Sequence, residues 1–159
     1  MAPTRRILLA LFLLSGSFRL ILLSAWAREL AIDLGPGPPT TGAILAAIAA
    51  SMAAGSIFVG RYADHSGRHP LAVHGLLEIG IGLYAVVSLV VAFLPGAAIA
   101  AAGGLATLPG SIAWVVRFLA ALSVVAVPAA MMGGSLPALA RVTTLKAGDA
   151  GWTVGSRSR

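Results

Sequence analysis

Four long apolar runs constrain this chain more strongly than any other feature. They cover residues 7–27, 42–60, 71–94 and 112–136. A helix of about 20 apolar residues rises about 30 Å, which matches the hydrocarbon thickness of a bilayer. Across the 159 residues, 58% are hydrophobic and 10% are charged, whereas about 25% are charged in an average soluble domain. The sequence therefore predicts an all-α, polytopic membrane protein with four transmembrane helices.

Three segments separate the four runs. Residues 60–69 carry charges and turn-forming residues, so the chain must leave the hydrocarbon there. Residues 34–39 are rich in Gly and Pro, and Thr40 or Thr41 is expected to cap the helix that follows. Residues 95–111 are uncharged and rich in Ala and Gly, and their apolar stretch 97–108 is too short to cross a bilayer. A further crossing would also place Arg141 and Lys146 outside, so we interpret 95–111 as an outer loop, with a partly re-entrant segment as the alternative.

The basic residues predict the orientation of the helices. With a cytoplasmic N-terminus, eight basic residues lie inside and Arg28 lies outside. The eight are Arg5, Arg6, Arg61, Arg68, Arg141, Lys146, Arg157 and Arg159. Because Lys and Arg accumulate in cytoplasmic loops, both termini are expected in the cytoplasm. We predict a transmembrane helical domain over 1–146 and a disordered cytoplasmic tail over 147–159.

A cleaved signal peptide over residues 1–27 is an alternative for the N-terminal run. The residues from Ser24 to Ala27 have the small-x-small form of a cleavage site. Arg19 argues against cleavage, because the apolar core of a signal peptide is a charge-free run. The charge asymmetry does not decide between the two interpretations, since the second helix enters from outside in both.

Composition excludes several classes of function. The chain has no Cys, which rules out a disulfide framework, a thiolate nucleophile and a Cys-based metal site. Its net charge is +6, but the basic residues are neither clustered nor interleaved with aromatics, so no nucleic-acid partner is expected. The expected partner is the lipid bilayer, together with self-association or other membrane helices. No catalytic residue, cofactor site or metal site is predicted.

Four polar residues within the apolar runs form a candidate intramembrane network: Arg19, His74, Glu78 and Arg117. Charges at such depth are costly, so they pair, extend to the headgroups or line a cavity. Helical rise brings Glu78 to a depth closer to Arg19 than to Arg117, and Arg19 is its predicted partner. Arg117 lies near the outer end of its run and is expected to extend to the headgroups. His74 precedes Glu78 by one turn, and the two form either a hydrogen bond or a proton or cation site.

Small residues indicate where helices approach closely. Ala43, Ala47, Ser51 and Gly55 follow one another at four-residue spacing, which favours close helix packing, although an Ala-rich composition alone would give the same pattern. In the last run, Gly133, Gly134 and Pro137 are expected to kink or end the helix.

The polar loop resembles a motif of the major facilitator superfamily, G-x-x-x-D-R-x-G-R-R, which lies on the cytoplasmic side between the second and third helices of those transporters. The matching positions are Gly60, Asp64, Gly67 and Arg68, with His65 and His69 at two positions that are basic in the motif. This resemblance implies a facilitator-like helical bundle and makes the chain comparable to the N-terminal part of a transporter.

A longer pattern resembles the membrane domain of the spermidine synthase-like family, bacterial proteins often described as fused facilitator-type transporter and spermidine synthase. Leu23 stands where the family usually has Glu, and Arg19 replaces an apolar residue. The matching residues are Ser15-Gly16, Trp26-Ala-Arg28, Gly55, Gly60-Arg-Tyr-Ala-Asp64, Leu77-Glu-Ile-Gly80-Ile-Gly-Leu-Tyr84, Arg117-Phe118, Pro128 and Met132-Gly-Gly-Ser-Leu-Pro137.

This second resemblance implies a multi-pass protein of the bacterial inner membrane, related to polyamine metabolism or transport. Family members commonly continue into further helices and an aminopropyltransferase domain. Here the sequence from Gly148 to Gly155 begins like the family's next helix and stops soon afterwards, so we expect a truncated fragment. The chain has five acidic residues and no Gly-rich turn on a strand, so it is not expected to be an enzyme. A small membrane scaffold is a further alternative.

Overall fold

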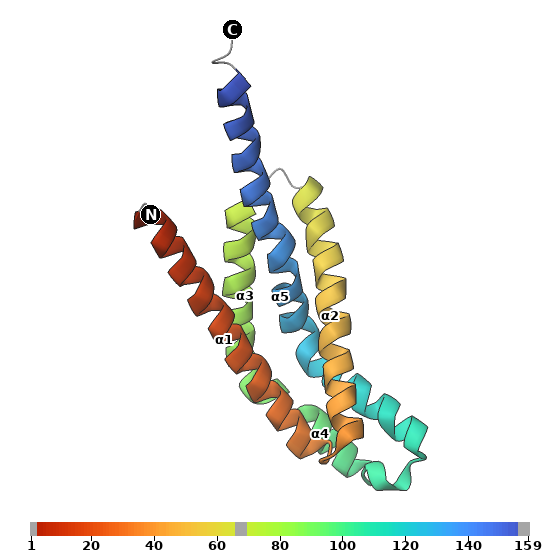
Figure 1. Ribbon diagram of the computed structural model, residues 1–159. Coiled ribbons are helices and arrows are strands. Elements are labelled where there is room, and N and C mark those ends of the chain that lie inside the picture. The colour runs from red at the N-terminus through yellow and green to blue at the C-terminus, as the bar shows by residue number, and fades with distance from the viewer. Residues whose placement is uncertain (1–2, 66–69, 156–159) are drawn as a thin grey trace. The chain divides into compact units, whose positions relative to one another are not determined.

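The computed structural model describes residues 3–65 and 70–155, and every element within them is helical (Figure 1). The long helices are α1 (Pro3–Asp33), α2 (Pro38–His65), α3 (Pro70–Val91) and α5 (Gly110–Gly155). A short helix, α4 (Leu94–Ala101), and a single 3-10 turn, η1 (Leu105–Thr107), connect α3 to α5. The all-α class predicted from the sequence is confirmed.

Three segments are long and apolar enough to cross a membrane. They are Pro38–Tyr62, Leu71–Ala101 and Gly110–Ser135, and they correspond to the last three apolar runs of the sequence. The first run, 7–27, lies within α1, but the side chains of its first turns are outside the described part of the chain. Its crossing of a membrane stays a prediction.

The segment after α3 differs from the predicted loop. The apolar run 71–94 is interrupted at Ala92 and Phe93, and a new helix begins at Leu94. Pro95 lies in the first turn of α4, where a helix does not need the backbone N–H that proline lacks. Residues 95–111 therefore contain one short helix and one 3-10 turn, and the Ala-rich sequence of α4 explains the difference because alanine favours helix.

The end of α5 also differs from the prediction. The helix continues through Pro128 and Pro137 to Gly155, so it does not end near Gly133, while the kink expected there stays a prediction. Residues 147–155 are helical where a disordered tail was expected, and residues 156–159 lie outside the described residues. Each internal proline removes a hydrogen bond only locally, and Gly133 and Gly134 pack against α2. Beyond Pro137 no further proline interrupts the chain, so the hydrogen-bond ladder continues.

The chain divides into two compact units. The first unit comprises Met1–Ala46 and Ser88–Val124, and the second comprises Ala47–Val87 and Val125–Arg159. Helices α2, α3 and α5 each contribute residues to both units. In the first unit, α4 lies beside the C-terminal end of α1 (Figure 1).

The core of the first unit is built from α1, the start of α2 and the first half of α5. Leu30 and Leu34 near the end of α1 are almost completely buried, as are Ala121 and Val124 on α5. Two glycines with positive φ, Gly35 and Gly37, reverse the chain between α1 and α2. Glycine adopts this conformation without the steric cost that other residues have. The break predicted over residues 34–39 is confirmed for residues 34–37, whereas residues 38 and 39 already belong to α2.

Candidate functional site

The carbonyl oxygen of Leu34 is the meeting point of three helices in the first unit. It belongs to the end of α1, where helix carbonyls have no partner within the helix. Thr40 Oγ1, in the first turns of α2, donates to this oxygen at 3.4 Å. Arg117 Nε, on α5, donates to the same oxygen at 3.3 Å. We call this arrangement of Leu34, Thr40 and Arg117 the carbonyl joint.

The carbonyl joint corrects one prediction and refines another. Neither Thr40 nor Thr41 caps α2: Thr40 donates to the end of α1, and Thr41 Oγ1 donates to the Gly37 carbonyl at 3.3 Å. The reason is that α2 begins at Pro38, so both hydroxyls lie inside its first turns and donate backwards. Arg117 is partly buried and bound to Leu34 rather than fully extended into the surroundings.

Asp33, the last residue of α1, lies against α4. A Cβ atom built on Gly96 would be 2.6 Å from the Asp33 Cγ. Gly96 is in the first turn of α4, where the backbone dipoles of a helix favour a negative charge. Glycine at this position lets the carboxylate approach the helix backbone. The contact joins α1 to α4 and was not predicted from the sequence.

Trp26 and Ser88 form a buried hydrogen bond within the first unit. The indole Nε1 of Trp26, on α1, donates to Ser88 Oγ on α3 at 2.9 Å. Both side chains are buried, with exposed fractions of 4% and 5%. A buried indole N–H usually requires an acceptor, and Ser88 is the only hydroxyl in the α3 sequence besides Tyr84. Both residues can be read from the sequence, but their pairing is recognised only in the structure, because 62 residues separate them.

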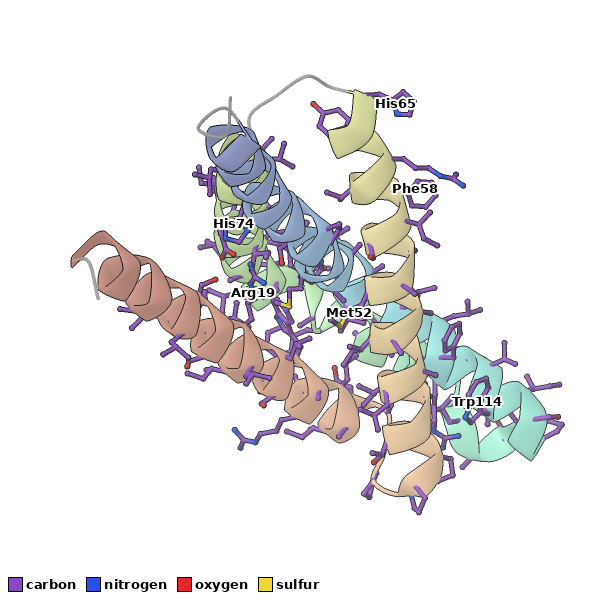
Figure 2. All side chains as sticks on the ribbon, turned by 45° about the horizontal axis from the view of Figure 1, so that its top comes forward. Arg19, Met52, Phe58, His65, His74 and Trp114 are labelled. Carbon is purple, nitrogen blue, oxygen red and sulfur yellow. The ribbon has the colours of Figure 1, made fainter. Side chains whose placement is uncertain are left out.

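His74 and Glu78 lie together on α3 in the second unit. The His74 Nε2 and Glu78 Oε1 atoms are 3.6 Å apart, four residues apart along the helix, and both side chains are partly exposed. The predicted shared face of the two residues is confirmed. His74 is labelled on α3 in Figure 2.

Arg19 is the third member of the candidate network. It lies on α1 in the first unit and is partly buried. Its predicted partner, Glu78, belongs to the second unit. Pairing of Arg19 with Glu78 therefore stays a prediction.

Helices α2 and α5 pack backbone to backbone in the second unit (Figure 1). A Cβ on Gly55 would overlap the backbone of Ala130, and a Cβ on Gly133 would overlap the backbone of Met52. Gly134 directly follows Gly133, and a Cβ on it would be 2.6 Å from the Cβ of Val59, which lies one turn after Gly55 on α2. Figure 2 shows Met52 on the side of α2 that faces α5. We call these contacts the glycine seam.

The glycine seam confirms part of the small-residue pattern. Ala43, Ala47, Ser51 and Gly55 are all buried, and Gly55 is in direct contact with another helix. Ser51 Oγ donates to the Ala47 carbonyl of its own helix at 2.7 Å, so its hydroxyl is satisfied within α2. Gly133 and Gly134 do not end α5, as one form of the prediction had it, and both pack against α2.

Only part of the loop motif of residues 60–69 falls within the described residues. Gly60 lies in the last turns of α2, and a Cβ there would be 3.9 Å from Pro137 Cβ. His65, the last residue of α2, places its Nδ1 2.8 Å from the Arg61 carbonyl. The side chain of Asp64, and Gly67 and Arg68 entirely, lie outside the described residues. The role of this motif stays a prediction.

The described residues contain no group of three or more His, Asp or Glu side chains that could hold a metal ion. Comparisons of the chain with protein-family models, with curated proteins and with solved structures found no match.

Proposed function

We propose that this chain is a non-catalytic membrane domain of a spermidine synthase-like protein, placed in the bacterial inner membrane with both termini in the cytoplasm. One observation carries the membrane part of the proposal. The three spanning segments expose large apolar side chains, while several polar side chains on the same helices bond to other helices. This is the distribution that a bilayer requires, because hydrocarbon solvates apolar groups and leaves polar ones unsatisfied.

The exposed face of α3 supports contact with lipid. Ile79, Leu83 and Val90 recur at helical spacing and are each more than 60% exposed. An exposed apolar stripe of this length is unfavourable in water, because contiguous apolar surface of that extent drives association. It is favourable against lipid tails. The opposite face of α3 carries the buried Val73, Ile81 and Ser88.

The family part of the proposal rests on residues with a clear packing role. Trp26 bonds Ser88, Gly55 and Gly133 form the glycine seam, and Pro128 is fully buried. These residues belong to the pattern shared with spermidine synthase-like membrane domains. A link to polyamine metabolism or transport follows from the resemblance. The structural roles support a domain that holds helices together and contributes no reacting group.

A second candidate function is that of a facilitator-type transporter part. The pair of His74 and Glu78, 3.6 Å apart on an apolar helix, favours it. Ionisable residues within membrane helices often form proton or cation sites. A site formed by four helices would require a second copy or further helices, because alternating access generally uses two structural repeats.

Membrane extraction combined with an activity assay tests the main proposal. Membranes containing the tagged chain are washed with alkaline carbonate, and the chain should stay in the pellet. The purified chain is then given decarboxylated S-adenosylmethionine and putrescine, and no spermidine above an empty-vector control is expected. Release by carbonate would contradict the membrane domain, and spermidine formation would contradict the absence of catalysis.

A further inference from the structure

The charge of Arg117 is the starting point. A guanidinium group carries five N–H donors and a full positive charge. Among the described residues, the Leu34 carbonyl is its one hydrogen-bond partner, through Nε. A neutral carbonyl does not compensate the charge, and within the described part of the chain no other group bonds to the two terminal amino groups. Asp33, the nearest acidic residue in sequence to Leu34, packs against Gly96 of α4.

The carbonyl joint defines the depth of this guanidinium. Leu34 is followed by the turn at Gly35 and Gly37, whose positive φ values end the helical hydrogen bonding. Irregular backbone of this kind is excluded from hydrocarbon, so in a membrane the Leu34 carbonyl lies at the level of the lipid headgroups. Arg117 starts about 10 Å along α5 from Gly110. Its bond to Leu34 brings the guanidinium to the same headgroup level.

Two aromatic side chains flank Arg117 on α5. Trp114 and Phe118 stack with ring centroids 5.6 Å apart, and Trp114, which projects from the first turns of α5 in Figure 2, is 39% exposed. Tryptophan is enriched where membrane helices meet the headgroups. Arg117 therefore shares its part of α5 with an aromatic pair of which Trp114 is exposed, as is usual where a helix meets the headgroups.

We propose that Arg117 binds the phosphate group of an anionic phospholipid. The terminal amino groups present a planar fork that matches two phosphate oxygens, and Nε stays on Leu34, so the fork is held in one orientation. Binding would compensate a charge for which residues 3–65 and 70–155, as far as their side chains are described, supply no carboxylate. This inference rests on the membrane placement proposed above, but not on the family or on the absence of catalysis.

Native mass spectrometry of the detergent-solubilised chain tests the proposal. Dissociation constants for phosphatidylglycerol and phosphatidylcholine are compared for the wild type, Arg117→Gln and Arg28→Gln. Arg28 is an exposed arginine on α1 in the same unit, so the two variants have the same net charge. We expect Arg117→Gln to bind phosphatidylglycerol about tenfold more weakly, as for the loss of a charge-assisted contact. Arg28→Gln should bind as the wild type does.

Further variants keep the test decisive. Folding of Arg117→Gln is judged by its helical circular dichroism. If this variant does not fold, Arg117→Lys and Arg28→Lys are compared in place of the two Gln variants. Of these, only Arg117→Lys should bind phosphatidylglycerol more weakly than the wild type. If the Arg117 variant and the matching Arg28 variant bind phosphatidylglycerol equally, Arg117 is not the binding site. If inorganic phosphate at equal concentration displaces phosphatidylglycerol, the site binds free phosphate, and the proposal that its ligand is a phospholipid is refuted. Release of the wild type from membranes by carbonate would instead refute the membrane placement.

Discussion

Arg117 Nε donates to the Leu34 carbonyl oxygen at 3.3 Å, although 83 residues separate the two in sequence. The bond ties the end of α1 to α5, and Thr40 donates to the same oxygen from α2. The Leu34 carbonyl at the end of α1 would otherwise lack a partner, and its two hydrogen bonds join α1 to α2 and α5. The polar residues of this apolar chain thus contribute to its architecture.

The two threonines at the start of α2 provide a matched test of the carbonyl joint. Thr40 is buried and donates to the end of α1, whereas Thr41 is exposed and donates to the carbonyl of Gly37, directly before its own helix. Thr40→Val should therefore lower stability by about 0.6 kcal/mol, the average for side-chain hydrogen bonds in membrane proteins. Thr41→Val should have a smaller effect. Thermal unfolding of both variants in detergent measures the difference, and equal losses would contradict the joint.

The glycine seam predicts a strong dependence on side-chain size. Gly55→Ala and Gly133→Ala each introduce a Cβ that overlaps the backbone of the facing helix. Overpacking of this kind costs about 1–3 kcal/mol, so both variants should unfold at lower temperature. Gly82→Ala on α3 is the control, because nothing lies within 4 Å of its Cβ position and alanine favours helix by up to about 1 kcal/mol over glycine. A stabilised Gly55→Ala variant would show that α2 and α5 are not in contact.

The Trp26–Ser88 hydrogen bond predicts non-additive effects. Ser88→Ala leaves the buried indole N–H without its acceptor, and Trp26→Phe removes the donor. The double variant should lose less stability than the sum of the two single variants, because the same interaction is removed once. Denaturation of all four proteins in one detergent gives the coupling energy. A coupling energy near zero would mean that the bond contributes nothing to folding.

Arg19 and Glu78 provide a further double-mutant test. If the two residues pair, Arg19→Leu or Glu78→Gln leaves a charge in low dielectric, and the double variant should recover part of the lost stability. If Glu78 works instead with His74, which lies 3.6 Å away, Arg19→Leu should leave that site intact. Additive losses in thermal stability would rule out the Arg19–Glu78 pair.

The sequence alone predicts the three spanning helices, but only a few of the contacts between them. The last three apolar runs predict the spanning helices because a hydrophobic run of that length has few alternatives. The carbonyl joint could not be predicted, since its acceptor is a backbone oxygen that every residue carries. The start of α2 at Pro38 and the length of α5 were misjudged for a related reason. Proline and glycine weaken a helix locally, and packing decides whether it continues.

Topology reporters give the most direct test of the central claim that the chain is a membrane domain with cytoplasmic termini. Alkaline phosphatase and green fluorescent protein are fused in parallel after Gly37, Ser66, Gly104 and Gly148. The first and third positions should be periplasmic and active as phosphatase, and the second and fourth should be cytoplasmic and fluorescent, because the basic residues favour the cytoplasmic side. A periplasmic signal at Gly148 would contradict this topology, and cytoplasmic signals at all four positions would contradict the membrane domain itself.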